Sequence, residues 1–205
     1  KADLSIALGT RLGDFTTCSK WLFQEPGAKI LGINVASHDA YKMDAEPVVA
    51  DAKLCLAALT AKLGRKGYRS AWGGEIERER GLWKAEVDRL YASEIPAPES
   101  PGGQGLAQVR ALGELNEILL PKSAVVVSGS GSIPSDMQRT WRVRVPGTYH
   151  MEYGFSCMGY ELAATLGAKL ACPDRECVAI VGDGAYAMLH SELLTAVQEG
   201  KKIGR

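Results

Sequence analysis

The stretch "VAIVGDGAYAM", residues 178–188, constrains the fold of this chain more than any other. An Asp-Gly pair between two apolar runs is a common hairpin turn, and a hairpin would require a second alternating strand after Gly184. The apolar residues that follow recur instead at helical spacing, and Gly200 ends the pattern. The stretch therefore predicts a strand, a tight turn and a helix.

The predicted turn, Gly182-Asp183-Gly184, joins the carboxyl end of the strand to the amino end of the helix. The first N–H groups of a helix have no intrahelical partner, and the helix dipole is positive there. With the Asp183 carboxylate beside them, these groups suit a phosphate and a metal ion bound together. A purely structural turn is the alternative, because short glycine motifs often occur without a ligand.

Apolar runs and amphipathic segments alternate along the rest of the chain. Pro47 and Gly64 fit the usual placement of proline near the start and glycine at the end of a helix, and Arg142 and Arg144 alternate with valines as on a solvent-facing strand. We expect buried strands within residues 4–15, 28–37, 123–134 and 176–181, and helices within residues 44–64, 68–93, 106–120, 156–172 and 185–200. This order predicts an α/β fold with parallel sheets, in which ligands bind at the carboxyl ends of strands.

A stretch rich in proline and glycine, "EIPAPESPGGQG", interrupts this pattern from residue 94. Three prolines and three glycines in twelve residues exclude a helix or a central strand. We therefore predict a linker at residues 94–104 between two domains, residues 1–93 and residues 105–205.

Composition narrows the class of partner. The 24 basic residues balance the 24 acidic ones, which favours neither a nucleic acid nor a membrane surface and leaves a small molecule as the expected ligand. Five cysteines without a Cys-x-x-Cys pair argue against a disulfide framework or a zinc site and favour the cytoplasm. Because the chain starts with Lys1 rather than Met, directly before an apolar run, and stops just after a helix, we expect it to be an internal piece of a longer protein.

Longer motifs resemble one family of enzymes. "GTRLGDFTT" (9–17), "GSIPSDMQRTWR" (131–142) and "HMEYGFSCMGYE" (150–161) are similar to the trihydroxycyclohexane-1,2-dione hydrolases, which depend on thiamine diphosphate. The Gly-Asp-Gly turn and "CMGYELAATLGAKLA" resemble the wider acetolactate-synthase-like group. The resemblance covers nearly the whole chain. It implies three-layer α/β domains of a three-domain enzyme, with the end of the central domain before the linker and the start of the diphosphate-binding domain after it.

The resemblance also implies an activity. It is the hydrolysis of a carbon–carbon bond in 3D-trihydroxycyclohexane-1,2-dione, which gives 5-deoxyglucuronate in myo-inositol catabolism, with thiamine diphosphate and Mg²⁺ as cofactors. The full-length enzyme would be a homodimer or homotetramer. The family's second metal ligand would lie beyond Arg205 and its pyrimidine-binding domain is not in this chain, so we expect the chain alone to be inactive.

Roles at the turn follow from the same resemblance. Asp183 would bind Mg²⁺, which favours carboxylates together with substrate phosphates. Small residues beside it would let the backbone approach the diphosphate. These residues are Gly182, Gly184 and Ala185. Gly131 and Ser132, after the neighbouring strand, would also contact the cofactor, with an ordinary turn as the alternative.

Further roles fall in the 150–161 motif. Met158 would wedge between the two cofactor rings, a task that suits a large, unbranched side chain, although a core methionine is the alternative. The backbone carbonyl of Ser156 would accept a hydrogen bond from the aminopyrimidine ring. His150 could move protons at the substrate ring, near Glu152 and Tyr153, with a structural histidine as the alternative.

Two other functions stay open. An enzyme of the acetolactate-synthase kind would use thiamine diphosphate on an open-chain 2-oxo acid, and pyruvate turnover would reveal it. A non-catalytic α/β module would hold only a phosphate at the Gly-Asp-Gly turn. Ligand binding that does not depend on magnesium would indicate the latter.

Overall fold

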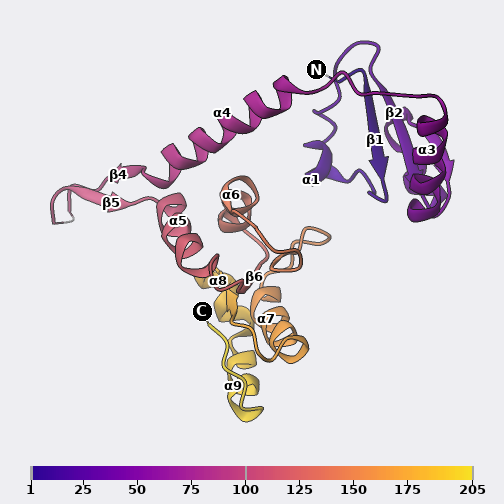
Figure 1. Ribbon diagram of the computed structural model, residues 1–205. Helices are drawn as coiled ribbons and strands as arrows, with labels where there is room; N and C mark the ends of the chain where they lie inside the picture. Colours follow the sequence, from indigo (N-terminus) through magenta and orange to yellow (C-terminus); the bar gives the residue numbers. More distant parts are fainter. Residues whose placement is uncertain (1, 100, 205) are drawn as a thin grey trace. The chain divides into compact units, whose positions relative to one another are not determined.

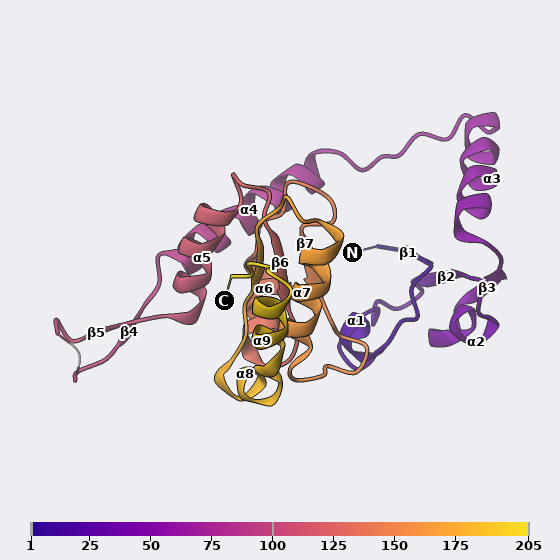
Figure 2. The same cartoon turned by 90° about the horizontal axis from the view of Figure 1, so that it is seen from below.

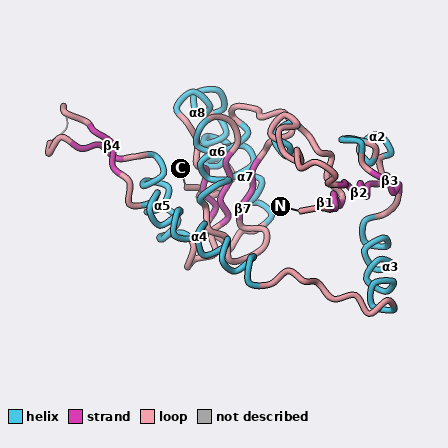
Figure 3. Tube along the Cα trace, turned by 90° about the horizontal axis from the view of Figure 1, so that it is seen from above, coloured by secondary structure: helices cyan, strands magenta, loops and turns pink. Residues whose placement is uncertain are grey.

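The computed structural model describes residues 2–99 and 101–204, so Lys1, Ser100 and Arg205 lie outside the described part. The chain divides into two compact units between Gly73 and Gly74. Figure 3 shows the irregular segment, residues 66–73, that joins them. No helix in the described residues is long and apolar enough to cross a bilayer.

The first unit is built on a parallel sheet with the order β1-β2-β3. Its elements are β1 (Leu4–Leu8), α1 (Asp14–Thr17), β2 (Lys29–Asn34), α2 (Ser37–Ala40), η1 (Lys42–Asp44), β3 (Glu46–Val49) and α3 (Ala52–Arg65) (Figure 1). Gly32 in β2 lets the chain pass close to α2, because a Cβ there would come 2.3 Å from the carbonyl oxygen of Ala40. The parallel arrangement of the first two strands was expected from their apolar runs.

Two expectations for the first unit were wrong. Residues 46–49 form a strand instead of the start of a helix, and α3 begins only at Ala52, where the Asp51 side chain accepts a hydrogen bond from the N–H of Leu54 (2.9 Å). Because β3 lies at the edge of the sheet, it tolerates Pro47, which has no N–H to donate. The second wrong expectation is that the first strand is buried. In β1, which also lies at an edge of the sheet, only Ala7 is buried.

The second unit is built on a parallel sheet with the order β7-β6-β8. Its elements are α4 (Gly74–Tyr91), β4 (Glu94–Pro96), β5 (Gln104–Leu106), α5 (Gln108–Leu119), β6 (Val125–Ser128), α6 (Ser132–Thr140), β7 (Tyr149–Met151), α7 (Tyr160–Ala171), β8 (Cys177–Ala179), α8 (Asp183–Leu189) and α9 (Ser191–Gln198). Gly204 forms one further parallel bridge with Val178 of β8.

Helices cover both faces of this second sheet. Val126 of β6 packs in a cluster with Leu112 of α5 and Met137 of α6. Its neighbours Val125 and Val127 point to the other face, where α7 covers them (Figure 2). This alternation is that of a central strand buried on both sides. The unit therefore has the three-layer α/β architecture that the sequence predicts.

The predicted linker lies within the second unit. Residues 94–96 and 104–106 pair as a two-stranded antiparallel hairpin, β4–β5. Helix α4, which precedes it, packs on α5, and the Tyr91 hydroxyl at its end donates to the carbonyl of Thr140 (2.6 Å). The compact units thus divide before α4, whereas the assignment of residues 1–93 and 105–205 to two enzyme domains stays a prediction.

The strand expected at residues 142–145 is absent from the described structure, where the segment is irregular. The backbone of Arg142 exchanges two hydrogen bonds with the side-chain amide of Asn116 (3.1 and 3.3 Å). Its guanidinium pairs with Asp88 and lies over the ring of Tyr91, 5.1 Å from the centroid. Arg142 therefore connects α4 to α5, and its interpretation as a strand residue was wrong.

Candidate functional site

Three loops of the second unit leave the same edge of the sheet. They follow β6 (residues 129–131), β7 (152–159) and β8 (180–182), and parallel strands bring their carboxyl ends together. The buried Ser128 hydroxyl, at the end of β6, donates to the carbonyl of Ile180 beyond β8 (2.9 Å). This edge therefore gathers the residues expected at the cofactor, whereas His150, expected at the substrate, lies within β7.

The Gly-Asp-Gly turn has the predicted form. Gly182 is extended (φ −76°, ψ 160°) and precedes α8, which begins at Asp183. The exposed Asp183 carboxylate accepts the N–H of Gly184 (2.8 Å), while Ala185 is buried. The strand, tight turn and helix are confirmed, and the carboxylate stands beside the first N–H groups of the helix.

Met158 lies against this turn. Its Cε atom is 3.2 Å from the point that a Cβ on Gly184 would occupy. The next residue, Gly159, has a left-handed backbone (φ 92°), and a Cβ there would come 2.9 Å from Cβ of Leu189 in α8. Two glycines thus allow close approach between the start of α7 and helix α8, with Met158 against the start of α8 and Gly159 against its end.

The loop after β6 adjoins the same segment. Ser156 has a positive φ (55°), and its Oγ lies 3.4 Å from Oγ of Ser130. Gly131, which precedes α6, also has a positive φ (106°), a conformation that glycine adopts without strain. The Ser132 hydroxyl donates to Oε1 of Gln108 (3.3 Å). The loops after β6 and β7 therefore meet through their serines.

Glu152 shapes the loop that carries Ser156 and Met158. Its two carboxylate oxygens accept the N–H groups of Phe155 and Cys157, each at 2.8 Å. These backbone hydrogen bonds favour the charged form and hold the pKa of Glu152 below its usual range. Glu152 thus acts here as a support of the loop.

His150 is not brought to this group. The residue lies in β7 with an exposed ring, and its Nε2 is 3.1 Å from the carbonyl oxygen of Gly147. Gly147 precedes β7, so the ring reaches back toward the amino end of the strand. The proton-transfer role expected for His150 has no support in this arrangement.

Sequence reasoning assigned no role to Glu161, which is wholly buried at this edge. Its carboxylate accepts the N–H groups of Ser130 (3.1 Å) and Gly159 (3.0 Å). A signal was present, because "YELAATLGAKLA" contains one acid in an otherwise apolar first half of a helix. However, an acid in the first turn of a helix is also expected from the helix dipole alone. The sequence therefore does not show that Glu161 has a further role.

The groups at this edge, one carboxylate and accessible backbone, suit the diphosphate end of thiamine diphosphate. They do not form a metal site built from protein ligands alone. In the described residues, no group of three or more His, Cys, Asp and Glu side chains is placed to hold a metal ion. Asp183 stands as a single carboxylate at a helix start, an arrangement in which Mg²⁺ takes most of its other ligands from phosphates and water. Open space at Gly182 and Gly131, where a Cβ would meet nothing within 4 Å, leaves the backbone accessible.

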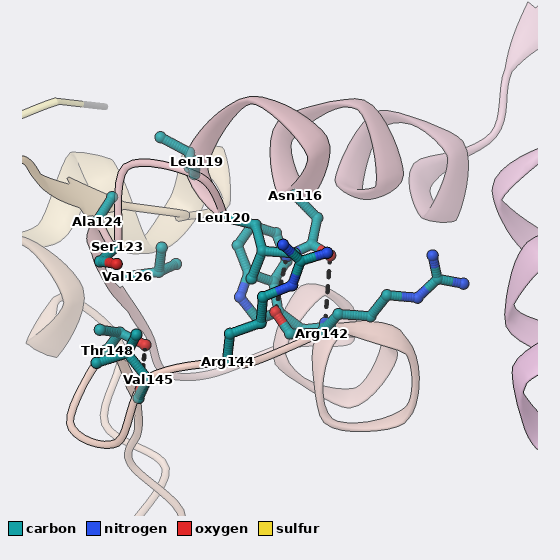
Figure 4. Close-up of a pocket in the computed structure, with 11 residues that line it drawn as sticks. Asn116, Leu119, Leu120, Ser123, Ala124, Val126, Arg142, Arg144, Val145 and Thr148 are labelled. Carbon is teal, nitrogen blue, oxygen red and sulfur yellow. Dashed lines mark hydrogen bonds between the residues drawn. The ribbon is translucent and has the colours of Figure 1, made fainter. Parts of the chain in front are cut away.

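The cavity in Figure 4 lies elsewhere in the second unit. It is lined by the end of α5 and by residues that precede or begin strands, among them Ala124 and Thr148. In the picture Asn116 and the backbone of Arg142 are joined by hydrogen bonds at one side of it. This cavity is therefore at the amino ends of β6 and β7, opposite the candidate site.

Comparison with known proteins finds a family match for part of the second unit. Residues 129–204 match the family "Thiamine pyrophosphate enzyme, C-terminal TPP binding domain". This range lies within the second unit. The matched range contains the three loops of the candidate site, so the resemblance seen in the motifs is confirmed for this part of the chain.

Relatives extend the match to the first unit. The chain is 47% identical to 3D-(3,5/4)-trihydroxycyclohexane-1,2-dione hydrolase of Clostridium tetani over 98% of its own length. It is 46% identical to the protein of the same name from Bacillus anthracis over 99% of its length, and equally to 3D-(3,5/4)-trihydroxycyclohexane-1,2-dione hydrolase 2 of Bacillus cereus. The chain spans 34% of the length of each of these curated relatives.

Proposed function

We propose that the full-length protein is a thiamine-diphosphate-dependent hydrolase of 3D-trihydroxycyclohexane-1,2-dione, which it opens to 5-deoxyglucuronate in myo-inositol catabolism. The observation that carries the proposal is the contact of Met158 with the Gly-Asp-Gly turn. The Met158 Cε atom lies 3.2 Å from the point that a Cβ on Gly184 would occupy. Identity of 47% to a hydrolase with that printed name supports the choice of substrate. The reaction adds one water and breaks one carbon–carbon bond.

In this proposal the chain's residues hold and orient the cofactor. Asp183 binds Mg²⁺, and the backbone at Gly182, Gly184 and Ala185 receives the diphosphate. Gly131 and Ser132 contact the same diphosphate end of the cofactor in this proposal. When bound, thiamine diphosphate supplies a carbon nucleophile and an electron sink for cleavage beside a carbonyl group.

In this proposal residues 152–158 contact the two rings of the cofactor. Met158 would wedge between the two cofactor rings, and the backbone carbonyl of Ser156, a residue with positive φ, would accept a hydrogen bond from the aminopyrimidine. We assign no step to His150, because its ring lies toward the carbonyl oxygen of Gly147. Assembly as a homodimer or homotetramer and a cytoplasmic location complete the proposal.

Calorimetric titration of thiamine diphosphate into the full-length protein, with and without Mg²⁺, tests the cofactor site. We expect magnesium-dependent binding that Asp183→Ala abolishes and Asp183→Asn weakens. Asp174→Ala is the matched control, because Asp174 is exposed in the loop before β8, at the other end of that strand. Equal affinity of wild type and Asp183→Ala would refute the proposed site.

Turnover then separates the substrates. Release of 5-deoxyglucuronate from the cyclic dione supports the proposal. Turnover of pyruvate without turnover of the dione would instead indicate an enzyme of open-chain 2-oxo acids.

A further inference from the structure

Glu161 is a buried carboxylate to which the proposed function gives no task. It lies in the first turn of α7 and is 0% exposed. A buried carboxylate is costly unless hydrogen bonds or a cation compensate it. Among the described residues no Lys, Arg or His pairs with it, and its partners are backbone N–H groups.

The two oxygens of Glu161 contact two different loops. Oε1 accepts the N–H of Ser130, which directly precedes Gly131. Oε2 accepts the N–H of Gly159, which directly follows Met158. Because the two oxygens belong to one rigid carboxylate, they fix the separation of these loops.

The chain leaves room for this carboxylate at Gly129. A Cβ on Gly129 would lie 2.9 Å from Oε1 and 3.0 Å from Cδ of Glu161. A side chain there would push the carboxylate away from at least one N–H group. The backbone of Gly129 is not left-handed, so its conformation does not require glycine. The space that Glu161 occupies does require it.

We infer that Glu161 is a positioning residue that bridges the loops after β6 and β7 and so sets the cofactor site before the cofactor binds. The inference rests on the proposed function, because the bridged segments are those assigned to the diphosphate and to the cofactor rings. Glu161 is wholly buried and its carboxylate contacts backbone, so the inference gives it no contact with cofactor or substrate. It acts through Gly131 on one side and through Met158 on the other.

The first test is Glu161→Gln in the full-length protein. Glutamine keeps the size of the side chain but presents one acceptor and one N–H₂ donor, so one of the two N–H groups loses its partner. Without cofactor, we expect amide hydrogen exchange at Ser130 or Gly159 to rise about tenfold, as for the loss of one hydrogen bond to a charged group. Glu114→Gln, at an exposed position of α5, is the matched control and should change neither.

The second test distinguishes positioning from a loss of stability. We expect Glu161→Gln to weaken thiamine diphosphate binding about tenfold and to keep turnover below wild type even at saturating cofactor, because added cofactor does not restore the place of Met158. Full recovery of turnover at saturation would overturn the inference. Gly129→Ala keeps the charge, displaces the same carboxylate and carries the test should Glu161→Gln fail to fold.

The outcomes separate this inference from the proposed function. If Asp183→Ala abolishes binding while Glu161→Gln and Gly129→Ala leave exchange and affinity unchanged, the role of Glu161 is refuted and the proposed function stands. If both variants raise exchange at the bridged amides while Asp183→Ala binds like wild type, the bridge stands and the proposed cofactor site fails.

Discussion

Replacement of Gly184 by alanine should separate the stability of the fold from cofactor binding. Gly184 is the second residue of α8 and its φ is not positive, so an alanine fits the backbone. Alanine in a helix is favoured over glycine by at most about 1 kcal/mol. The new methyl would meet Met158 Cε at 3.2 Å, which requires that atom to move by a few tenths of an ångström.

That movement costs little in the protein without cofactor. Met158 is 46% exposed and flexible, so its end can shift into solvent. We therefore expect the free energy of unfolding of Gly184→Ala to be unchanged or higher by up to about 1 kcal/mol. Cofactor binding should fall, because the methyl stands where the diphosphate approaches the turn. Loss of one charge-assisted hydrogen bond, about 1.5–3 kcal/mol, corresponds to an affinity about 10- to 150-fold weaker.

Chemical denaturation without cofactor and calorimetric titration with Mg²⁺ measure the two effects. Gly81→Ala is the control: Gly81 lies inside α4, where a Cβ would meet nothing within 4 Å, so the variant should gain stability and bind normally. Unchanged affinity in Gly184→Ala would refute the placement of the diphosphate at this turn. A loss of stability above about 1 kcal/mol would refute the reasoning that the end of Met158 shifts at little cost.

Three further variants test the second unit. Gly113→Ala places a Cβ 2.6 Å from Cγ of Tyr91 and should lower the free energy of unfolding by about 1–3 kcal/mol despite its better helix propensity, as denaturation would show. Tyr149→Phe removes a buried hydroxyl for which the described residues offer no partner, and should raise the melting temperature, with a gain of up to about 1 kcal/mol. Glu152 has a pKa lowered from 4.5, so its stabilising contribution is present above pH 4.5 and lost as pH falls through the folded-state value. Glu152→Gln should therefore flatten the acid side of a stability-against-pH curve, and an unchanged curve would contradict the loop contacts.

The parts of the site that sequence reasoning could predict are those encoded by neighbouring residues. Gly182, Asp183 and Gly184 stand between an apolar run and a helical repeat, so the form of the turn follows from local pattern alone. The helix after the turn was expected to be continuous, whereas it divides at His190 into α8 and α9. A gap of one residue leaves the apolar spacing nearly intact, and periodicity therefore does not detect it.

Patterns fail where one residue type has two uses. Proline is common in the first turn of a helix and also in edge strands of a sheet. For Pro47, only the pairing of β3 with β2 decides between the two. Arg142 and Arg144 alternate with valines, but the backbone bonds of Arg142 go to Asn116, 26 residues earlier. Such partners are set by packing of helices that a local window does not contain.

The same limit explains why Glu161 escaped sequence reasoning while Met158 did not. Met158 was assigned through a motif, so its place at the turn came from resemblance rather than from physical chemistry. Glu161 stands in that motif too, but its partner Ser130 lies 31 residues earlier and offers only a backbone N–H, which every residue except proline has. The role of Glu161 depends on two loops that parallel strands bring to one edge. A carboxylate that binds backbone is visible only when the fold that buries it is known.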